Sequence, residues 1–561
     1  MILPNVWGQG QLFAFSALDG DSFSRDDLAG ILSGDKIGVR FFTKVKRELA
    51  LILSGGPAPE FDAVTGDVIS LRYHGEELGM VFAERHLVCG TAAGGAAAAC
   101  MVEGICRTEY RAGIEIHDTG DGEFTALARE GNRFAFAFAQ SLEDAVSLAR
   151  RGIAIDANAV KEERLCMYRK HFLPEEHPYA QLYAKCISVL KTQLYTPEGQ
   201  IRHTWSTPDR LPHKYMWLWD SVFHSVGWRN LDGKLAEDLI LAVFDAQRED
   251  GFIPHMAAPD MATGITQPPV LGWGALKVFE KTGNRDFLRT VFEKNRRFLN
   301  WCVNRRRRTD EMLFSWNTED DINCRCGESG MDNSPRFDAA AMLQTIDFSC
   351  FMANDARCMQ KMAEILELSE EAQEFANFYR EIKTAVNEKL WCPEDGFYYD
   401  YDILTEKIHK VRTVASFLPL FAGICEEKQA QKLVRALFDP EDFKTPLMIP
   451  SVSRKEETFG TDMWRGSVWI NFNYMITQGL KEFGFAKEAE EIAARTLETL
   501  KEWYVRKGVI YEFYDWENKM APCELKRKGP VYEPYDFTIR SQSVRDYGWT
   551  CALAIDWLEN A

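Results

Sequence analysis

The feature that most constrains the fold of this 561-residue chain is a change of hydrophobic period at about Ser141. Before that residue, short runs rich in β-branched and aromatic side chains alternate with Gly and Asp. After it, long amphipathic stretches follow one another across short loops. A period of two is typical of strands and a period of 3.6 of helices. The sequence therefore predicts a β-rich segment followed by a mainly α-helical one.

The β-rich segment is expected to span residues 1–140 as an N-terminal domain. Its strand candidates are Leu12–Phe15, Gly38–Phe42, Val68–Tyr73, Gly113–Ile116 and Phe134–Phe138. Short strands separated by turn residues indicate an antiparallel, sandwich-like domain. Residues 141–170 have a helical pattern and are expected to form a linker to the rest of the chain.

Residues 171–561 are expected to form the third and largest part. About a dozen helical patterns fit there: Ala180–Tyr195, Asp220–Asn230, Leu235–Arg248, Leu271–Thr282, Asp286–Asn304, Asp338–Ala353, Ala372–Leu390, Glu427–Phe438, Val468–Phe483, Glu488–Arg506 and Ser543–Leu558. Six helical hairpins make an (α/α)6 barrel, whose inner helices bring the loops at one end around a single pocket. An α-solenoid is the alternative, but it needs a repeat of fixed period, which this sequence lacks.

Composition and charge exclude several classes of partner. Asp and Glu total 84 against 66 Lys and Arg, a net charge of -18, which repels polyanions such as nucleic acid. No uncharged run is long and apolar enough to cross a bilayer. The first residues lack the basic and apolar regions of a secretory signal, and fourteen cysteines fit reduced thiols, so a cytoplasmic location is expected. Cys324 and Cys326 lack a second ligand pair, and no metal or cofactor is expected.

Aromatic and carboxylate residues cluster between the helical patterns or at their starts. The clusters are Trp217–Asp220, Gln267–Pro269, Glu328–Asp338, Trp464–Trp469 and Tyr511–Glu517. In a helical barrel these loops would converge on one pocket. The C–H face of a sugar ring stacks on aromatic rings and its hydroxyls need fixed polar partners. The clusters therefore predict a small carbohydrate as the ligand.

Two acids within these clusters suit the cleavage of a glycoside, which generally needs a pair of carboxyl groups. Asp332 and Glu512 both lie among apolar or aromatic neighbours, and burial there is expected to raise their pKa. Each also has a structural interpretation. Asp332 suits the N-cap of a helix that begins at Asp338, and Glu512 suits an exposed position on a short strand. Considered singly, each residue favours that structural interpretation.

A family resemblance favours the catalytic interpretation of both residues. The segment Glu328–Arg336, E-S-G-M-D-N-S-P-R, resembles the general-acid motif of glycoside hydrolase family 63 and is similar to the E-S-G-x-D segment of the family 37 trehalases. The segment Tyr511–Asp515 looks like the general-base segment of those families. Further matches follow in order over roughly Pro178 to Leu558, at Trp219–His224, Gln267–Pro269, Trp464–Trp469 and Tyr547–Thr550.

The resemblance implies an inverting α-glycosidase on an (α/α)6 barrel, with Asp332 as general acid and Glu512 as general base. It also implies that the substrate is bound by Trp219, Trp464 and Trp469, which would wall the sugar, by Asp220 and Gln267, which would hold its hydroxyls, and by Arg336 and Arg465 with less support. Arg336 is expected chiefly to position the acid loop through an ion pair.

The chain departs from the family pattern at two places. Cys326 and Gly327 stand where relatives often have an aromatic residue, so one wall of the sugar site is expected to differ. A basic insertion, Cys523–Tyr532, follows the base segment and contains Lys526, Arg527 and Lys528. It is expected to reach toward a charged aglycone.

Other functions on the same barrel remain open from the residues alone. A sugar epimerase or isomerase needs two bases flanking the ring, and no pair of histidines falls in the motif loops. A phosphorylase would replace the base by a phosphate site, and a non-catalytic sugar-binding protein would tolerate loss of either acid. The sugar, glucosyl or mannosyl, and the aglycone are not determined by the barrel motifs.

Overall fold

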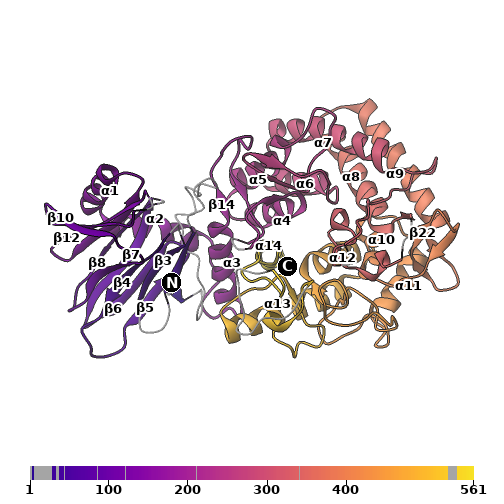
Figure 1. The fold of residues 1–561 in the computed structure, drawn as a ribbon. Helices are drawn as coiled ribbons and strands as arrows, with labels where there is room; N and C mark the ends of the chain where they lie inside the picture. The colour runs from indigo at the N-terminus through magenta and orange to yellow at the C-terminus, as the bar shows by residue number, and fades with distance from the viewer. Residues whose placement is uncertain are drawn as a thin grey trace. The chain divides into compact units, whose positions relative to one another are not determined.

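The computed structural model describes residues 3–5, 28–32, 37–42, 45–84, 86–120, 122–209, 212–321, 323–339, 342–528 and 540–560. The chain divides into two compact units, Met1–Glu198 with Lys501–Val509, and Gly199–Leu500 with Ile510–Ala561 (Figure 1). The predicted strand Leu12–Phe15 and the second half of the basic insertion lie outside the described residues. The boundaries at residues 140 and 170 stay predictions.

The first unit is built on two β-sheets. In its described part, a nine-stranded sheet has the order β1 (Leu3–Asn5), β5 (Glu60–Val64), β6 (Val68–Tyr73), β7 (Glu76–Glu84), β8 (Leu87–Thr91), β13 (Arg133–Ala139), β12 (Phe124–Glu130), β11 (Ile114–Asp118) and β10 (Arg107–Arg111). A four-stranded sheet has the order β2 (Leu28–Leu32), β3 (Ile37–Phe42), β4 (Lys46–Ile52) and β9 (Ala97–Val102). The described pairings are antiparallel except that of β1 with β5.

The two sheets pack face to face. The ring of Phe41 on β3 lies 5.2 Å from that of Phe136 and 5.1 Å from that of Phe138, both on β13. Arg47 on β4 is fully buried and its Nε donates to Thr125 on β12 at 2.7 Å. Interdigitated side chains between two antiparallel sheets define a sandwich. The predicted β-rich N-terminal region is confirmed.

Helices α1 (Leu142–Ala154) and α2 (Ala157–Lys170) form the segment that was expected to be a linker. Ser141 caps α1 by accepting from the backbone N–H of Asp144, and Asp156 caps α2. Helix α1 packs on β13 and β12, and α2 packs on β7. The apolar face of each helix thus covers the large sheet. The same unit contains α3 (Ala180–Thr192) and β14 (Leu194–Tyr195).

The second unit is a closed ring of helices. Its described helices are α4 (Leu218–Trp228), α5 (Gly233–Asp245), α6 (Leu271–Thr282), α7 (Arg285–Arg306), α8 (Ile346–Ile365), α9 (Ser369–Lys389), α10 (Leu418–Phe421), α11 (Glu427–Leu437), α12 (Ile470–Glu482), α13 (Ala486–Lys507, whose last turns group with the first unit) and α14 (Gly548–Glu559). Each even-numbered helix packs on the next, and α14 returns to α4 (Figure 1). Helices α5 and α7 pack outside that ring. The predicted (α/α)6 barrel is confirmed.

The first inner helix is buried around its whole circumference, because its neighbours cover every face. Every residue of α4 is buried. At Gly227 a Cβ atom would lie 2.5 Å from the Cα of Ala552 on α14, so these two helices approach more closely than any side chain permits. The glycine therefore allows the last inner helix to close against the first.

Short strands and 3-10 turns occupy the loops between these helices. The strands are β15 (Trp205–Ser206), β16 (Met216–Trp217), β17 (Met256–Ala258), β18 (Met261–Ala262), β19 (Leu343–Gln344), β20 (Trp391–Cys392), β21 (Phe397–Tyr398), β22 (Asp400–Asp402), β23 (Lys407–His409), β24 (Val468–Trp469) and β25 (Phe513–Tyr514). The 3-10 turns are η2 (Gly327–Ser329), η3 (Pro335–Phe337), η4 (Val414–Phe417) and η5 (Pro522–Glu524).

One predicted helix start is wrong. The helix expected from Asp338 begins instead at Ile346. Ser334 and Pro335 are early-helix signals, but they start only the single turn η3, because Leu343 and Gln344 then pair with β22 as a strand. Asp332 is consequently not the N-cap of a long helix, and that structural interpretation of the residue is wrong.

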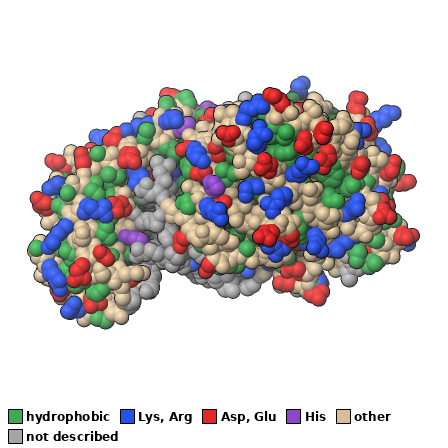
Figure 2. All heavy atoms as spheres, turned by 90° about the horizontal axis from the view of Figure 1, so that it is seen from above, with side chains coloured by type: hydrophobic (Ala, Val, Ile, Leu, Met, Phe, Trp, Pro, Cys, Tyr) green, Lys and Arg blue, Asp and Glu red, His purple; other side chains and the backbone are tan. Residues whose placement is uncertain are grey.

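The surface carries charges of both signs. Figure 2 shows Lys and Arg side chains interspersed with Asp and Glu over the face that it presents. Within the described part of the chain, no helix has the length and the apolar composition that a bilayer crossing requires.

Candidate active site

A cavity of about 90 Å³ lies where the inner helices begin. It is lined by His213, Trp217, Trp219, Asp220, Gln267, Gly330, Asp332, Met463, Trp469, Glu512, Arg527, Lys528, Arg540, Tyr547 and Trp549. These residues come from the first turns of α4 and α14 and from the loops before α4, α6, α8, α12 and α14. The barrel thus gathers side chains separated by hundreds of residues at one end.

Tryptophan rings form the wall of the cavity. The rings of Trp219 and Trp549 meet edge to face at 5.5 Å, and Trp469 lies 5.9 Å from Trp549. Trp464 does not line the cavity. It is fully buried and stacks on Trp469 at 3.8 Å with an interplanar angle of 3°. Trp219 and Trp469 are therefore placed to face a sugar, and Trp464 supports Trp469 from behind.

The acid loop rests on Trp219. Gly330 has a φ of +71°, and a Cβ atom there would lie 2.3 Å from the Trp219 ring. Only glycine fits a left-handed residue at this distance. Gln267 meets the same tryptophan from another side, since its Oε1 accepts from the Trp219 backbone N–H at 3.3 Å.

Two sets of buried ion pairs hold the ends of the loop Glu328–Arg336, which is called the acid loop here because it contains Asp332. Glu328 accepts from Arg306 Nε at 3.0 Å and from the backbone N–H of Asn317 at 2.9 Å. Arg336 donates to Asp347 at 2.7 and 3.0 Å and to Asp400 at 2.8 Å through two nitrogens. The guanidinium of Arg336 is fully engaged and lies outside the cavity lining, which fits a role in holding the loop.

Arg465 is also directed away from the cavity. Its guanidinium pairs with Asp338, and it does not line the cavity with the neighbouring Met463. Of the nine residues proposed from the sequence, the cavity brings together Asp332, Glu512, Trp219, Asp220, Gln267 and Trp469, and it leaves Arg336, Trp464 and Arg465 behind it.

Asp332 is paired with a lysine. Lys528 Nζ donates to Asp332 Oδ2 across 196 positions of sequence. Burial raises the pKa of Asp332, but the charge and hydrogen bond of Lys528, helped by Arg527, outweigh it and the net pKa lies below the ordinary value of 3.8. The expectation that burial would raise this pKa is wrong, because the sequence does not show that Lys528 of the basic insertion pairs with Asp332. In this state the carboxyl group is ionised.

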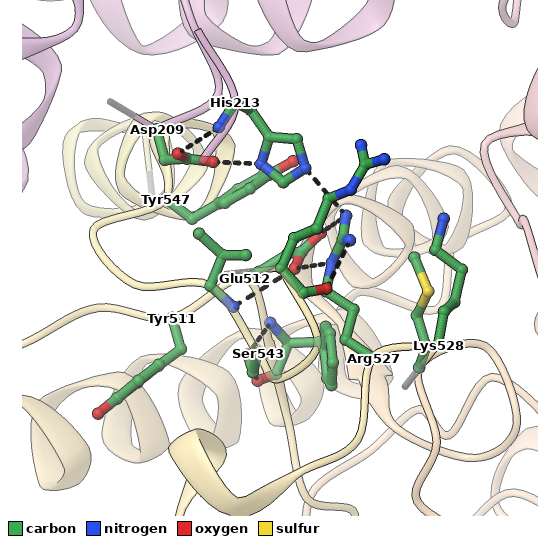
Figure 3. A network of polar contacts seen from close by, with 12 residues as sticks. Asp209, His213, Tyr511, Glu512, Arg527, Lys528, Ser543 and Tyr547 are labelled. Carbon is green, nitrogen blue, oxygen red and sulfur yellow. Dashed lines mark hydrogen bonds and ion pairs between the residues drawn. The ribbon is translucent and has the colours of Figure 1, made fainter. Parts of the chain in front are cut away.

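Glu512 is paired with an arginine and is only 1% exposed. Arg527 Nε donates to Glu512 Oε2 at 2.8 Å, and Nη2 donates to Oε1 at 3.2 Å (Figure 3). Glu512 directly precedes β25, which pairs with β24 and so sets it beside Trp469. The structural interpretation as an exposed acid on a strand is wrong.

A third carboxyl group, that of Asp220, lies in the same cavity. Burial, followed by the charge of Glu512, raises its pKa well above 3.8. The hydroxyl of Tyr547 lies 3.4 Å from Asp220 Oδ1. Burial and the neighbouring Glu512 thus both favour the neutral form of Asp220, while Arg527 donates to Glu512.

Several lining residues were not assigned a role from the sequence. Tyr547 and Trp549 belong to a segment that carries the family resemblance, and Arg527 and Lys528 belong to the basic insertion, so these had a signal. His213 had none, since a single histidine ordinarily packs without function. Within the described ranges, no group of three or more His, Cys, Asp or Glu side chains is arranged to hold a metal ion.

A ring of paired helices with carboxyl groups beside tryptophan walls is typical of six-hairpin glycoside hydrolases. The pattern of the mannosylglycerate hydrolase MGH1-like glycoside hydrolase domain matches residues 213–550, and the chain belongs to that family. The resemblance to glycoside hydrolase family 63 is thereby confirmed. The chain is a family 63-like glycoside hydrolase related to mannosylglycerate hydrolases.

Individual relatives agree with this assignment. A mannosylglycerate hydrolase of Thermus thermophilus is 25% identical over 442 residues, which are 64% of this chain and 97% of that protein. The crystal structure of the family 63 mannosylglycerate hydrolase from Thermus thermophilus in complex with glucose is 25% identical, with a TM-score of 0.55 over 67% of this chain and 100% of that one. An uncharacterised protein of Borreliella burgdorferi is 28% identical over 51% of this chain, and the match spans 56% of its length.

Proposed function

We propose that the chain is an inverting hydrolase of an α-glucoside or α-mannoside with a small acidic aglycone, with Asp332 as general acid and Glu512 as general base. One observation carries the proposal: Asp332 and Glu512 line the same buried cavity together with Trp219 and Trp469. Two acids beside aromatic walls are the requirement of glycoside hydrolysis.

The reaction follows from these positions. Glu512 accepts a proton from a water molecule as the water oxygen forms a bond to the anomeric carbon. The bond from that carbon to the glycosidic oxygen breaks, its electron pair passes to the oxygen, and this oxygen takes the proton of Asp332. The products are a free alcohol and a sugar of inverted anomeric configuration, and the two carboxyl groups should stand about 6.5–9.5 Å apart.

The cations of the cavity support an acidic aglycone. Lys528 and Arg540 line it, and Lys528 holds the acid in its ionised form. An anionic aglycone offers Lys528 another partner. Once Lys528 leaves Asp332, burial raises the pKa of the carboxyl group and favours the protonated form that donates to the glycosidic oxygen. The Thermus relative is named for a glycoside of this kind, mannosylglycerate.

The size of the cavity also indicates that Lys528 moves when a substrate binds. Its volume of about 90 Å³ is well below the roughly 300–1,000 Å³ of common ligand pockets. Arg527 and Lys528 occupy the space beside the two acids, so a substrate has to displace at least the more exposed lysine. Movement of Lys528 would therefore both make room and release the acid.

An epimerase on this barrel has less support. It needs two bases on opposite faces of the ring, and among the described residues His213 is the one histidine in the cavity lining. Its Nε2 accepts a hydrogen bond from Arg527 and is therefore not available as a base.

The test is the stereochemistry of hydrolysis. α-Mannosylglycerate and α-glucosylglycerate are incubated with the protein, and proton NMR follows the first sugar formed. We expect the β-anomer to appear before mutarotation. Initial release of the α-anomer would overturn inversion. Cleavage of the neutral glycerol glycosides with equal kcat/KM would overturn the acidic aglycone, and no cleavage of any of the four would overturn the proposed function.

A further inference from the structure

A chain of polar contacts leads away from Glu512 to residues that the proposed reaction does not use (Figure 3). Arg527, which holds Glu512, also donates from Nη2 to His213 Nε2 at 3.3 Å. The other ring nitrogen of His213, Nδ1, contacts Asp209 Oδ2, and the backbone N–H of His213 donates to Asp209 Oδ1 at 3.0 Å. Asp209 and His213 are thus joined to the proposed base through one arginine.

The direction of these bonds fixes the protonation of His213. An arginine side chain can only donate, so Nε2 must offer a lone pair. The ring proton is then on Nδ1 and is donated to Asp209 Oδ2. Burial lowers the pKa of His213 well below 6.5, and Arg527 lowers it further. A neutral histidine of defined tautomer follows.

Further hydrogen bonds restrict the conformation of Arg527. Its backbone N–H donates to Ser541 O at 2.8 Å, and its Nη1 donates to Arg540 O at 3.2 Å. Arg527 and His213 are both buried. Water does not compete for these hydrogen bonds. The position of His213 Nε2 therefore sets the orientation of the Arg527 guanidinium, and the guanidinium in turn sets the plane of the Glu512 carboxylate.

We propose that Asp209 and His213 are positioning residues for the general base: they hold Arg527 so that its fork fixes the carboxylate of Glu512 toward the attacking water. The proposal rests on the proposed role of Glu512. A misplaced catalytic group loses much of its rate, and loss of a supporting partner typically costs about 10–100-fold in activity.

Three substitutions test the successive contacts from Asp209 through His213 to Arg527. In His213→Leu the acceptor for Arg527 is lost, and kcat should fall about 10–100-fold. In His213→Gln an amide oxygen can accept from Arg527, so part of the rate should return. In Asp209→Asn the new NH2 group can donate to Nδ1 and shift the ring proton to Nε2, where it faces the arginine. This variant should be as slow as His213→Leu.

A matched control is available in the same unit. His203 Nδ1 contacts Asp245 Oδ2 at 2.8 Å, so the two residues form another Asp–His pair, but neither lines the cavity. His203→Leu breaks an equivalent pair without touching Arg527. It should keep the kcat and the KM of the unchanged protein. A loss equal to that of His213→Leu would assign the effect to stability and overturn the proposal.

The split between kcat and KM distinguishes positioning from a general loss of folded protein. Arg527 donates to both carboxylate oxygens of Glu512, at 2.8 and 3.2 Å, so a turned fork misplaces the group that activates the water. In His213→Leu and Asp209→Asn we therefore expect a lower kcat per folded molecule with little change of KM. A purely structural role would lower the concentration of folded enzyme and leave the kcat per folded molecule in place.

Failure of this proposal and failure of the proposed function give different results. Each variant is assayed on α-mannosylglycerate and α-glucosylglycerate after its thermal unfolding shows a folded protein. If Glu512→Gln keeps full activity, the base assignment itself is wrong. If Glu512→Gln is inactive while Asp209→Asn and both His213 variants keep the kcat of the unchanged protein, Glu512 remains the base and the positioning role is overturned.

Discussion

At the scale of single residues, each proposed catalytic carboxyl group has its own cation, and the two cations are neighbours in sequence. Arg527 holds Glu512 with two hydrogen bonds in a buried setting, whereas Lys528 reaches Asp332 from a more exposed position. The base keeps its partner until the reaction begins, because it has to be ionised to accept the proton of the water. The acid has to lose its partner, because it must be protonated before it donates.

The different needs of the two acids lead to a first prediction. Asp332→Asn removes the leaving-group proton, and Glu512→Gln removes the acceptor for the water proton, so either change should slow ordinary glycosides by about 10² to 10⁴-fold. A fluoride or dinitrophenyl α-glycoside, which needs no protonation, should restore Asp332→Asn far better than Glu512→Gln. Steady-state kinetics on both substrate types measure this, and equal restoration would overturn the assignment of acid and base.

Lys528 provides a second prediction. This lysine lowers the pKa of Asp332 and so limits the pH range in which the acid is protonated. In Lys528→Met, burial acts unopposed by that charge and the pKa of Asp332 rises. The descending limb of kcat/KM should then move to higher pH with a neutral aglycone such as glycerol. With glycerate, KM should increase, because the cation for the carboxylate is gone. An unmoved limb would contradict the role given to Lys528.

The sequence motifs located residues that the structure brings together, and the catalytic roles of these residues stay predictions. Asp332, Glu512 and Trp219 stand in contiguous motifs, and all three line the cavity. The basic insertion showed that cations follow the Glu512 segment, but it did not show which acid each cation meets. Lys528 is 196 positions from Asp332, and His213 is 314 positions from Arg527, so no spacing rule connects them.

At the scale of elements, the residues that line the cavity stand in the first turns of inner helices or just before them, at α4, α6, α8, α12 and α14. Loops at those starts are held by buried contacts rather than by the helices themselves, as Gly330 illustrates by lying against the Trp219 ring. Helix α6 was predicted with its observed bounds, whereas α10 was missed, because it is a single turn containing Pro419. Tertiary pairing of β19 with β22 also overrode the local helix signals at Ser334 and Pro335.

Gly330 gives a prediction for the acid loop. In Gly330→Ala the new Cβ atom meets the Trp219 ring and the residue is left-handed, so the loop must move. We expect kcat to fall about 100-fold, since a shift of 1 Å is worth that much. Gly484→Ala is the matched control, because Gly484 is also left-handed at φ +83° but has open space around it. It should lose a similar amount of stability to thermal unfolding and keep its kcat.

At the scale of the whole molecule, the fold class was predictable, because the hydrophobic period of the sequence indicates the number and the order of the helices. Closure of the ring was not, since it depends on the fit of α14 against α4. That contact is made through Gly227 and Ala552 at the end of α4 remote from Trp219.

The closure contact can be tested by Gly227→Ala. The added Cβ atom would lie 2.5 Å from backbone of α14, so the helices must separate, at a cost of about 1–3 kcal/mol by urea unfolding. Because the change is at the opposite end of α4 from the cavity, kcat at low temperature should be unchanged. Gly233→Ala meets only the methyl group of Thr282 and should cost less. Equal losses in the two variants would show that ring closure is not the tight contact.

The return of α14 to α4 has a consequence for how the protein becomes active during its synthesis. Helix α14 is the last inner helix to leave the ribosome, and it brings Tyr547 and Trp549 to a cavity whose other walls are made earlier. Until then the first inner helix lacks its neighbour and the sugar site lacks one side. The cavity of a nascent chain is therefore complete only once α14 has been made, and a chain that stops before Gly548 lacks the Trp549 wall.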